Sequence, residues 1–247
     1  MKKINIFGDS HVAILRDAIG GKSESAGKNI WRQSFKNITF DFYNRDGRAW
    51  RKFTYLGSDK LHLKSQLNID IKEDPIDFII DLQKNDELFI FSGIMHTPMT
   101  YGASDWKDGL IPWWLNKKIP SYKKLASTDV LHHMIYSNVE LMLNFLKTLK
   151  KKGLKLGVLD SPRPLRRSHI LHRVDNQLII PLDRLHREVV LHHLKQNNIE
   201  IILTPSEAFD GDGFQKQMYS AQDESDPHHG SSRWGTLMLD ELVRRYS

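Results

Sequence analysis

Five short runs of strand-forming residues are spaced along the chain and alternate with longer segments of helical periodicity. Each run is apolar, and several end in Gly, Asp, Ser or Pro, as buried strands often do. The runs are Ile4–Phe7, Ile38–Tyr43, Glu87–Phe91, Lys155–Leu159 and Glu200–Leu203. Strands that alternate with helices are joined by right-handed crossovers into a mainly parallel sheet. The sequence therefore predicts an α/β protein with three layers, α/β/α, around a five-stranded sheet.

The helical segments are long enough to cover both faces of such a sheet. Their apolar residues recur about every 3.6 positions, which is the spacing of one buried helix face. They are Ser127–Lys151, Pro181–Gln196 and Ser231–Arg245, and a shorter helix follows the first strand. Because the chain has 247 residues, of which 40% are hydrophobic, it can bury one large core. We therefore expect residues 1–247 to form a single domain.

The segment 97–120 does not fit this alternation. It carries four large aromatic residues among Gly, Pro and Lys, namely Tyr101, Trp106, Trp113 and Trp114. A loop of this length in a compact protein is usually functional or disordered, and disordered segments contain few aromatic residues. We expect a lid or binding wall here, with Trp113 and Trp114 as candidate substrate contacts. Ordinary packing over the sheet is the alternative.

Ser10 directly follows the first predicted strand, within Gly8-Asp9-Ser10-His11. Ligands of parallel sheets bind beyond the carboxyl ends of the strands, which is where Ser10 lies. Gly8 permits a tight turn, and the start of the next helix offers backbone N–H groups to a developing oxyanion. Ser10 is therefore a candidate nucleophile. The alternative is a serine that only caps the helix.

A second motif lies near the other end of the chain. Asp226 and His229 are three residues apart in the turn before the last predicted helix. Such an aspartate can accept a hydrogen bond from the imidazole and fix its tautomer, so that the other ring nitrogen can take the proton of a serine. The alternative is a plain Asp-Pro turn. His228 is the other candidate base, but its spacing from Asp226 is wrong.

Taken together, the Gly-Asp-Ser turn after the first strand and the Asp-x-x-His before the last helix resemble the SGNH (GDSL-like) hydrolase superfamily. The resemblance implies a flavodoxin-like fold and a triad of Ser10, Asp226 and His229 that hydrolyses an acyl ester without a metal or an organic cofactor. It also implies that the N–H groups of Ser10 and Gly47 line the oxyanion hole.

The third block departs from the family pattern. The family has Gly-x-Asn-Asp, in which the asparagine donates to the oxyanion, whereas this chain has Met95 at the asparagine position. His96 is the candidate replacement, with Asn44 as a second candidate, and a loop-anchoring role for His96 is the alternative. Loss of one oxyanion donor typically lowers the rate by about 10²–10³. A catalytically degenerate binding domain therefore remains an alternative function, as does an O-acyltransferase that uses the same triad.

Basic residues follow the fourth predicted strand at the same edge of the sheet. Arg163, Arg166 and Arg167 could bind a carboxylate, phosphate or sulfate group of a substrate, and a solvated basic loop is the alternative. A net charge of +6 favours anionic partners in general, but no nucleic-acid-binding signature accompanies it. We expect a small-molecule or saccharide ester substrate, which includes anionic esters, and we expect no nucleic acid.

Several other classes of protein are excluded or disfavoured. The chain has no cysteine, which excludes disulfides, thiolate catalysis and cysteine-ligated zinc. Its twelve histidines include adjacent pairs, but there is no His-x-x-x-His motif, so we expect no metal site. No apolar run approaches the roughly 18 residues of a membrane span, and the first apolar stretch is too short for a signal peptide. We therefore expect a cytoplasmic protein.

Overall fold

The computed structural model describes residues 2–20, 30–44, 53–54, 60–65, 78–81, 87–96, 110–112, 124–166, 176–222 and 229–247. Its main sheet has six strands in the order β11-β10-β7-β1-β3-β2. Their bounds are β1 Lys2–Gly8, β2 Ile30–Phe35, β3 Ile38–Asn44, β7 Leu88–Phe91, β10 Lys155–Leu159 and β11 Glu200–Ile202. All neighbours pair in parallel except β2 and β3. The five predicted strands are confirmed, and the parallel ones have the flavodoxin-like order 2-1-3-4-5.

The sixth strand, β2, is an addition that the sequence pattern did not predict. It pairs antiparallel with β3 at the edge of the sheet, with Phe35 opposite Ile38. The turn between these two residues is Lys36-Asn37, which lacks the glycine that usually marks a two-residue hairpin. Lys36 nevertheless has a left-handed backbone, with φ of 53°. The local signal for a hairpin is therefore missing although the hairpin forms.

Two smaller sheets lie outside the main one. In the first, β4 (Phe53–Thr54), β5 (Lys60–Ser65) and β6 (Phe78–Asp81) pair antiparallel. In the second, β8 (Leu110–Pro112) pairs in parallel with β9 (Lys124–Ala126). Apart from β8, the aromatic segment 97–120 lies outside the described residues, so the lid and the roles of Trp113 and Trp114 stay predictions.

The predicted helices are present, with one change of boundary. They are α1 Ser10–Ala18, α5 Thr128–Lys151, α6 Asn176–Gln196 and α7 Ser232–Tyr246, and the short 3₁₀ helices η3 Ser206–Ala208 and η4 Gln217–Tyr219 precede α7. Helix α6 begins at Asn176 rather than at Pro181, which lies inside the helix. A proline there removes one backbone hydrogen bond. The flanking Ile179, Ile180 and Leu182 are buried against α5, and this packing keeps the first turns helical.

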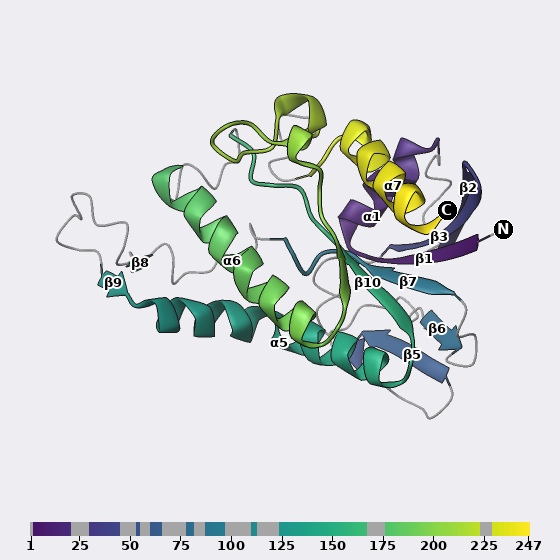
Figure 1. The fold of residues 1–247 in the computed structure, drawn as a ribbon, viewed down its shortest axis with the longest axis horizontal. Helices are drawn as coiled ribbons and strands as arrows, with labels where there is room; N and C mark the ends of the chain where they lie inside the picture. The colour runs from purple at the N-terminus through teal and green to yellow at the C-terminus, as the bar shows by residue number, and fades with distance from the viewer. Residues whose placement is uncertain are drawn as a thin grey trace, which may run out of the picture.

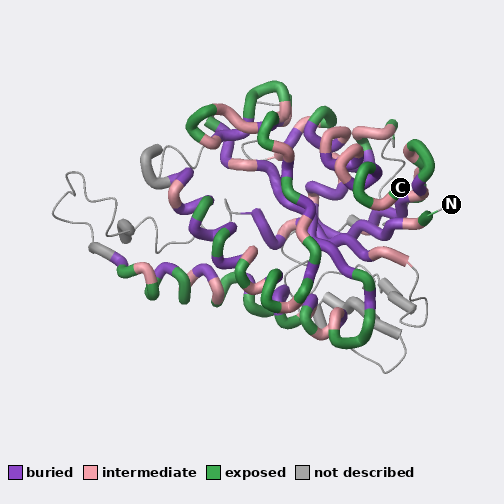
Figure 2. Tube along the Cα trace, in the orientation of Figure 1, coloured by how far each residue is buried: buried purple, intermediate pink, exposed green. Residues whose placement is uncertain are grey.

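Helices cover both faces of the sheet, α1 and α7 on one and α5 and α6 on the other (Figure 1). Successive side chains of a strand point to opposite faces. Ile4 and Ile6 of β1 accordingly pack with α1 and α7, whereas Phe7 packs with α5 and α6. Figure 2 shows buried residues concentrated along the central strands. No helix among the described residues is long and apolar enough to cross a membrane.

Helices α1 and α7 are in close contact at Gly235. A Cβ atom on this residue would lie 2.8 Å from the backbone oxygen of Ile14 and 2.8 Å from the Cβ of Ala18. Only glycine allows the two helix backbones to come this close. Since Ser10 begins α1 and His229 lies just before α7, this contact helps to hold these two residues close together.

We predict that Gly235→Ala lowers the stability of the protein, because the new methyl group meets backbone that cannot move aside. Overpacking costs about 1–3 kcal/mol, offset in part by the better helix propensity of alanine, about 1 kcal/mol. Denaturant unfolding measures the difference. The control is Gly211→Ala, where a Cβ would meet nothing within 4 Å and the change should stay within about 0.5 kcal/mol. A Gly235→Ala protein as stable as wild type would contradict the prediction.

Candidate active site

Ser10 and His229 lie in direct contact although 219 residues separate them in the chain. The Oγ atom of Ser10 is 2.5 Å from the Nε2 atom of His229, which is hydrogen-bond distance. Ser10 is the first residue of α1 and is partly exposed. The N-cap of α1 is Asp9, whose side chain accepts from the N–H of His11. The alternative that Ser10 only caps this helix is therefore wrong, and its hydroxyl faces a histidine.

The end of β1 is held against the loop that follows β7. A Cβ on Gly8 would lie 2.8 Å from Cγ2 of Val12 and 2.9 Å from Cβ of Ser92, so no larger residue fits there. The N–H of Ser92 donates to the carbonyl of Phe7 at 2.8 Å. These contacts fix the turn that presents Ser10 relative to the loop that carries His96.

The main chain around His229 is fixed from both sides. Its carbonyl accepts from the N–H of Ala221 at 3.0 Å, and the N–H of Ser231 donates to the carbonyl of Tyr219 at 2.8 Å. A Cβ on Gly230 would lie 2.9 Å from the indole ring of Trp234 in α7. Close packing and a short backbone ladder therefore hold the imidazole beside Ser10.

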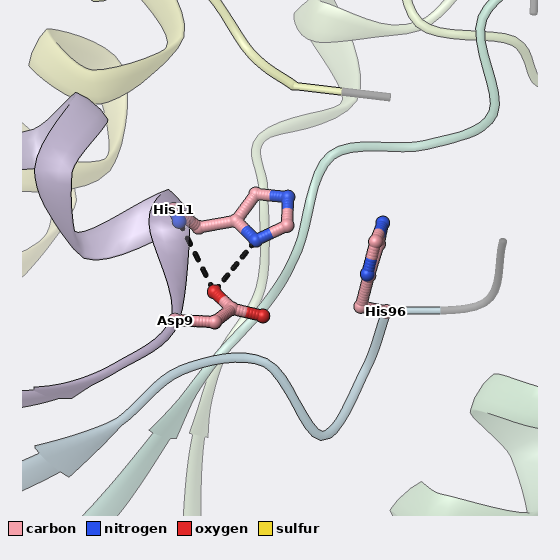
Figure 3. A group of neighbouring side chains, drawn as sticks. All are labelled: Asp9, His11 and His96. Carbon is pink, nitrogen blue, oxygen red and sulfur yellow. Dashed lines mark hydrogen bonds and ion pairs between the residues drawn. The ribbon is translucent and has the colours of Figure 1, made fainter. Parts of the chain in front are cut away.

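Three buried side chains, those of Asp9, His11 and His96, form a group that Figure 3 shows. Asp9 and His11 come from the start of α1, and His96 comes from the segment after β7. Oδ1 of Asp9 accepts from Nδ1 of His11 at 2.7 Å and from its backbone N–H at 3.1 Å. The ring of His11 is 4.6 Å from that of His96 and 5.1 Å from that of His229, between centroids. His11 thus joins the group to the Ser10–His229 pair.

The carboxyl group of Asp9 keeps its negative charge in spite of its burial. Burial alone would raise its pKa, but the charge of His11, the hydrogen bonds from His11 and the charge of His96 together hold the pKa of Asp9 below its usual range. An ionised aspartate is therefore buried one residue away from Ser10. Sequence reasoning missed Asp9 and His11, and the available signal was the Asp-x-His spacing at the start of a helix.

His96 is fixed in a turn at the end of β7. Its N–H donates to the carbonyl of Gly93 at 3.1 Å, and Gly93 has a φ of 101°, which suits glycine. Met95 is fully buried in the core under α5 and α6, whereas His96 contacts His11 under α1. Met95 thus belongs to the core under α5 and α6, whereas His96 contacts the start of α1.

The other sequence-predicted residues divide into two sets. Asp226, His228, Gly47, Arg167, Trp113 and Trp114 lie outside the described residues. Asn44 is the last residue of β3 and pairs with Gly8, which places its backbone at the same sheet edge as Ser10. The roles assigned to these residues stay predictions.

Arg163 and Arg166 are engaged by carboxylates of the chain itself. Nη1 of Arg163 is 2.7 Å from Oδ2 of the buried Asp183. Arg166 is exposed, and its Nε donates to Asp210 at 2.8 Å while its Nη2 donates to Asp212. An anionic substrate would compete with these pairs, and a substrate role for the two arginines stays a prediction.

No protein-family model matches the chain, and no curated protein matches its sequence. Among solved structures, a member of the lipolytic protein G-D-S-L family from Veillonella parvula DSM 2008 has a TM-score of 0.41 and 11% identity, covering 100% of this chain and 98% of its own. An acetyl xylan esterase has a TM-score of 0.45 and 11% identity, with coverages of 99% and 100%. A carbohydrate acetylesterase family member from Sinorhizobium meliloti has a TM-score of 0.44 and 9% identity, with coverages of 99% and 98%. The structural neighbours of the chain over its full length thus include GDSL-type lipolytic proteins and acetyl esterases, at low sequence identity.

Proposed function

We propose that this chain is a serine-dependent acyl-ester hydrolase with Ser10 as its nucleophile. The observation that carries the proposal is the 2.5 Å contact between Oγ of Ser10 and Nε2 of His229. A serine hydroxyl is a weak nucleophile unless a base within hydrogen-bond reach takes its proton. Here the base comes from the far end of the chain and meets the serine at the carboxyl edge of the sheet, where ligands of this fold class bind.

The proposed reaction has two stages. Ser10 attacks the acyl carbonyl, and its proton passes to Nε2 of His229 and then to the departing alcohol, which leaves an acyl group on Ser10. Water next loses a proton to His229 and attacks the acyl-enzyme, which releases the acid and restores the serine. Asp226, three residues before His229, would accept from Nδ1–H and hold the tautomer that leaves Nε2 available. These steps need no organic cofactor.

The oxyanion would be stabilised from three directions. Ser10 lies in the first turn of α1, where backbone N–H groups have no partner within the helix. Gly47 is the second proposed donor. His96 is proposed for the place that an asparagine takes in SGNH hydrolases, with Asn44 as the second candidate, because Met95 lies in the core and has no N–H in its side chain.

A cavity of about 640 Å³ reaches the residue that follows His229, but neither Ser10 nor His229 is among its lining residues. It is bounded by α1, η4 and the start of α7, and its lining includes Ile14, Gln217 and Gln222. Gly230, which follows His229, also lines it. A small-molecule or saccharide ester is the proposed substrate, and the amide and hydroxyl groups of this lining would contact only a part of it that lies away from the reacting carbonyl.

Ser10→Ala should abolish ester turnover and labelling by a fluorophosphonate probe, since both need the serine oxygen. His229→Ala should reduce kcat/KM to a similar residual level, because members of a triad act as a unit. His228→Ala is the matched control and should stay within a few-fold of wild type. Labelling that survives in the alanine variant of Ser10 would remove this residue from the mechanism. Turnover that rises with an added alcohol acceptor would identify an acyltransferase.

His96→Ala should lower kcat by about 10²–10³ with little change in KM, because an oxyanion donor acts mainly in the transition state. A histidine that only anchored its loop would instead change KM and the melting temperature together. Steady-state kinetics and a melting curve on the same preparation decide between these outcomes. An unchanged kcat would make Asn44 the next candidate.

Arg163→Gln should lower the melting temperature, because it leaves the buried carboxylate of Asp183 with fewer partners. Arg166→Gln should change it little, since its ion pairs are exposed. If either arginine binds an anionic substrate, its variant should also have a higher KM for a charged ester and an unchanged KM for a small neutral ester. If both variants keep the wild-type KM for the charged ester, these arginines do not bind the anionic group.

A further inference from the structure

We propose that Asp9, His11 and His96 bind one divalent metal ion of the zinc type beside the Ser10–His229 pair. One nitrogen or oxygen atom from each residue lies within 4.8 Å of the corresponding atoms of the other two. In Figure 3 the carboxylate of Asp9 and the ring of His11 face the ring of His96. Three side chains with metal-binding atoms thus surround one point. Two of them come from the start of α1, and the third comes from the segment after β7.

The separations are close to those that a bound ion requires. Nitrogen and oxygen ligands lie at about 2.0–2.2 Å from zinc, so neighbouring ligand atoms of a tetrahedral site are roughly 3.4 Å apart. No pair of the three atoms therefore has to close by more than about 1.4 Å. Small rotations of side chains can supply such a movement without a change of backbone.

Burial favours ion binding at this point. Asp9, His11 and His96 are exposed by only 5%, 0% and 3%. Ligand atoms that water does not solvate lose little hydration when they bind an ion. The backbone has already ordered the ligands, because Asp9 caps α1 and the Gly93 turn holds His96.

The ligand types indicate which ion fits. Two imidazoles and one carboxylate suit zinc and similar transition metals, whereas magnesium and calcium prefer oxygen ligands throughout. Three protein ligands also leave a fourth position open, as in catalytic rather than structural zinc sites. The Asp-x-His spacing of Asp9 and His11 is visible in the sequence, but the third ligand, His96, follows a different strand and is brought to them only by the fold.

A second group of histidines provides a control. His132 and His133 of α5 and His192 and His193 of α6 line a groove with Glu188 between the two helices. Surface histidines of this kind also take up zinc, so stoichiometry alone does not locate the ion. Variants of His192 and His193 distinguish zinc binding in the groove from zinc binding by Asp9, His11 and His96, because none of these three residues belongs to α6.

The test is a calorimetric Zn²⁺ titration of the full chain after treatment with a chelator. Wild type should bind one tight equivalent. His11→Gln and His96→Gln should each weaken it by at least about 100-fold, since changes in residues that merely support a ligand already cost 10–100-fold. The double variant His192→Gln, His193→Gln should keep it. Ser10→Ala should also keep it, so the site is tested independently of ester hydrolysis.

Two results would overturn the proposal: a wild type without a tight equivalent, or a tight equivalent that survives in both His11→Gln and His96→Gln. Both variants change buried residues, so a melting curve must first show that they fold. If they do not, X-ray absorption on a variant in which His132, His133, His192 and His193 are all changed to Gln counts the imidazoles around one equivalent of Zn²⁺ directly. Two imidazoles with oxygen ligands support the site, and any other number contradicts it.

Discussion

The contact between α1 and α7 at Gly235 is the constraint on which the rest of the candidate site depends. Ser10 belongs to the beginning of the chain and His229 to its end, and no local interaction can bring them together. The two helices cover the same face of the sheet and share one core, and the missing side chain at Gly235 lets their backbones meet. The 2.5 Å contact between the serine and the histidine is a consequence of this packing.

The parallel strands could be predicted because both of their faces are buried. Such strands are continuous apolar runs, which makes β1, β7 and β10 visible without any knowledge of their neighbours. Strand β2 lies at an edge and mixes Arg32 and Gln33 with apolar residues, so its pattern is weak. Ser10 and His229 were predictable because each lies at the end of a recognisable element. The group of Asp9, His11 and His96 was not, because it exists only where the loops after β1 and β7 adjoin.

The net charge of the chain does not predict the local charge at the carboxyl edge of the sheet, where Ser10 and His229 lie. Asp160 and Asp183 are buried there and both pair with the buried Arg187, which also donates to the carbonyl of Ser161. Arg163 joins the same network through Asp183. The net charge of +6 therefore does not mean that the basic side chains here lack carboxylate partners. Arg163 and Arg187 both form ion pairs with aspartates of the chain itself. Such ion pairs depend on where α6 and β10 lie in the fold, and the amino-acid composition does not give these positions.

His96 is proposed here both as an oxyanion donor and as a metal ligand, and the two roles are compatible because imidazole has two nitrogens. A nitrogen that binds a metal carries no proton, so the proton must reside on the other nitrogen, which then donates. A bound cation also withdraws electron density from the ring and strengthens this N–H as a donor. An asparagine needs no such help, since its amide always has N–H groups. His96 in both roles would thus tie the proposed third oxyanion donor to the occupancy of the proposed metal site.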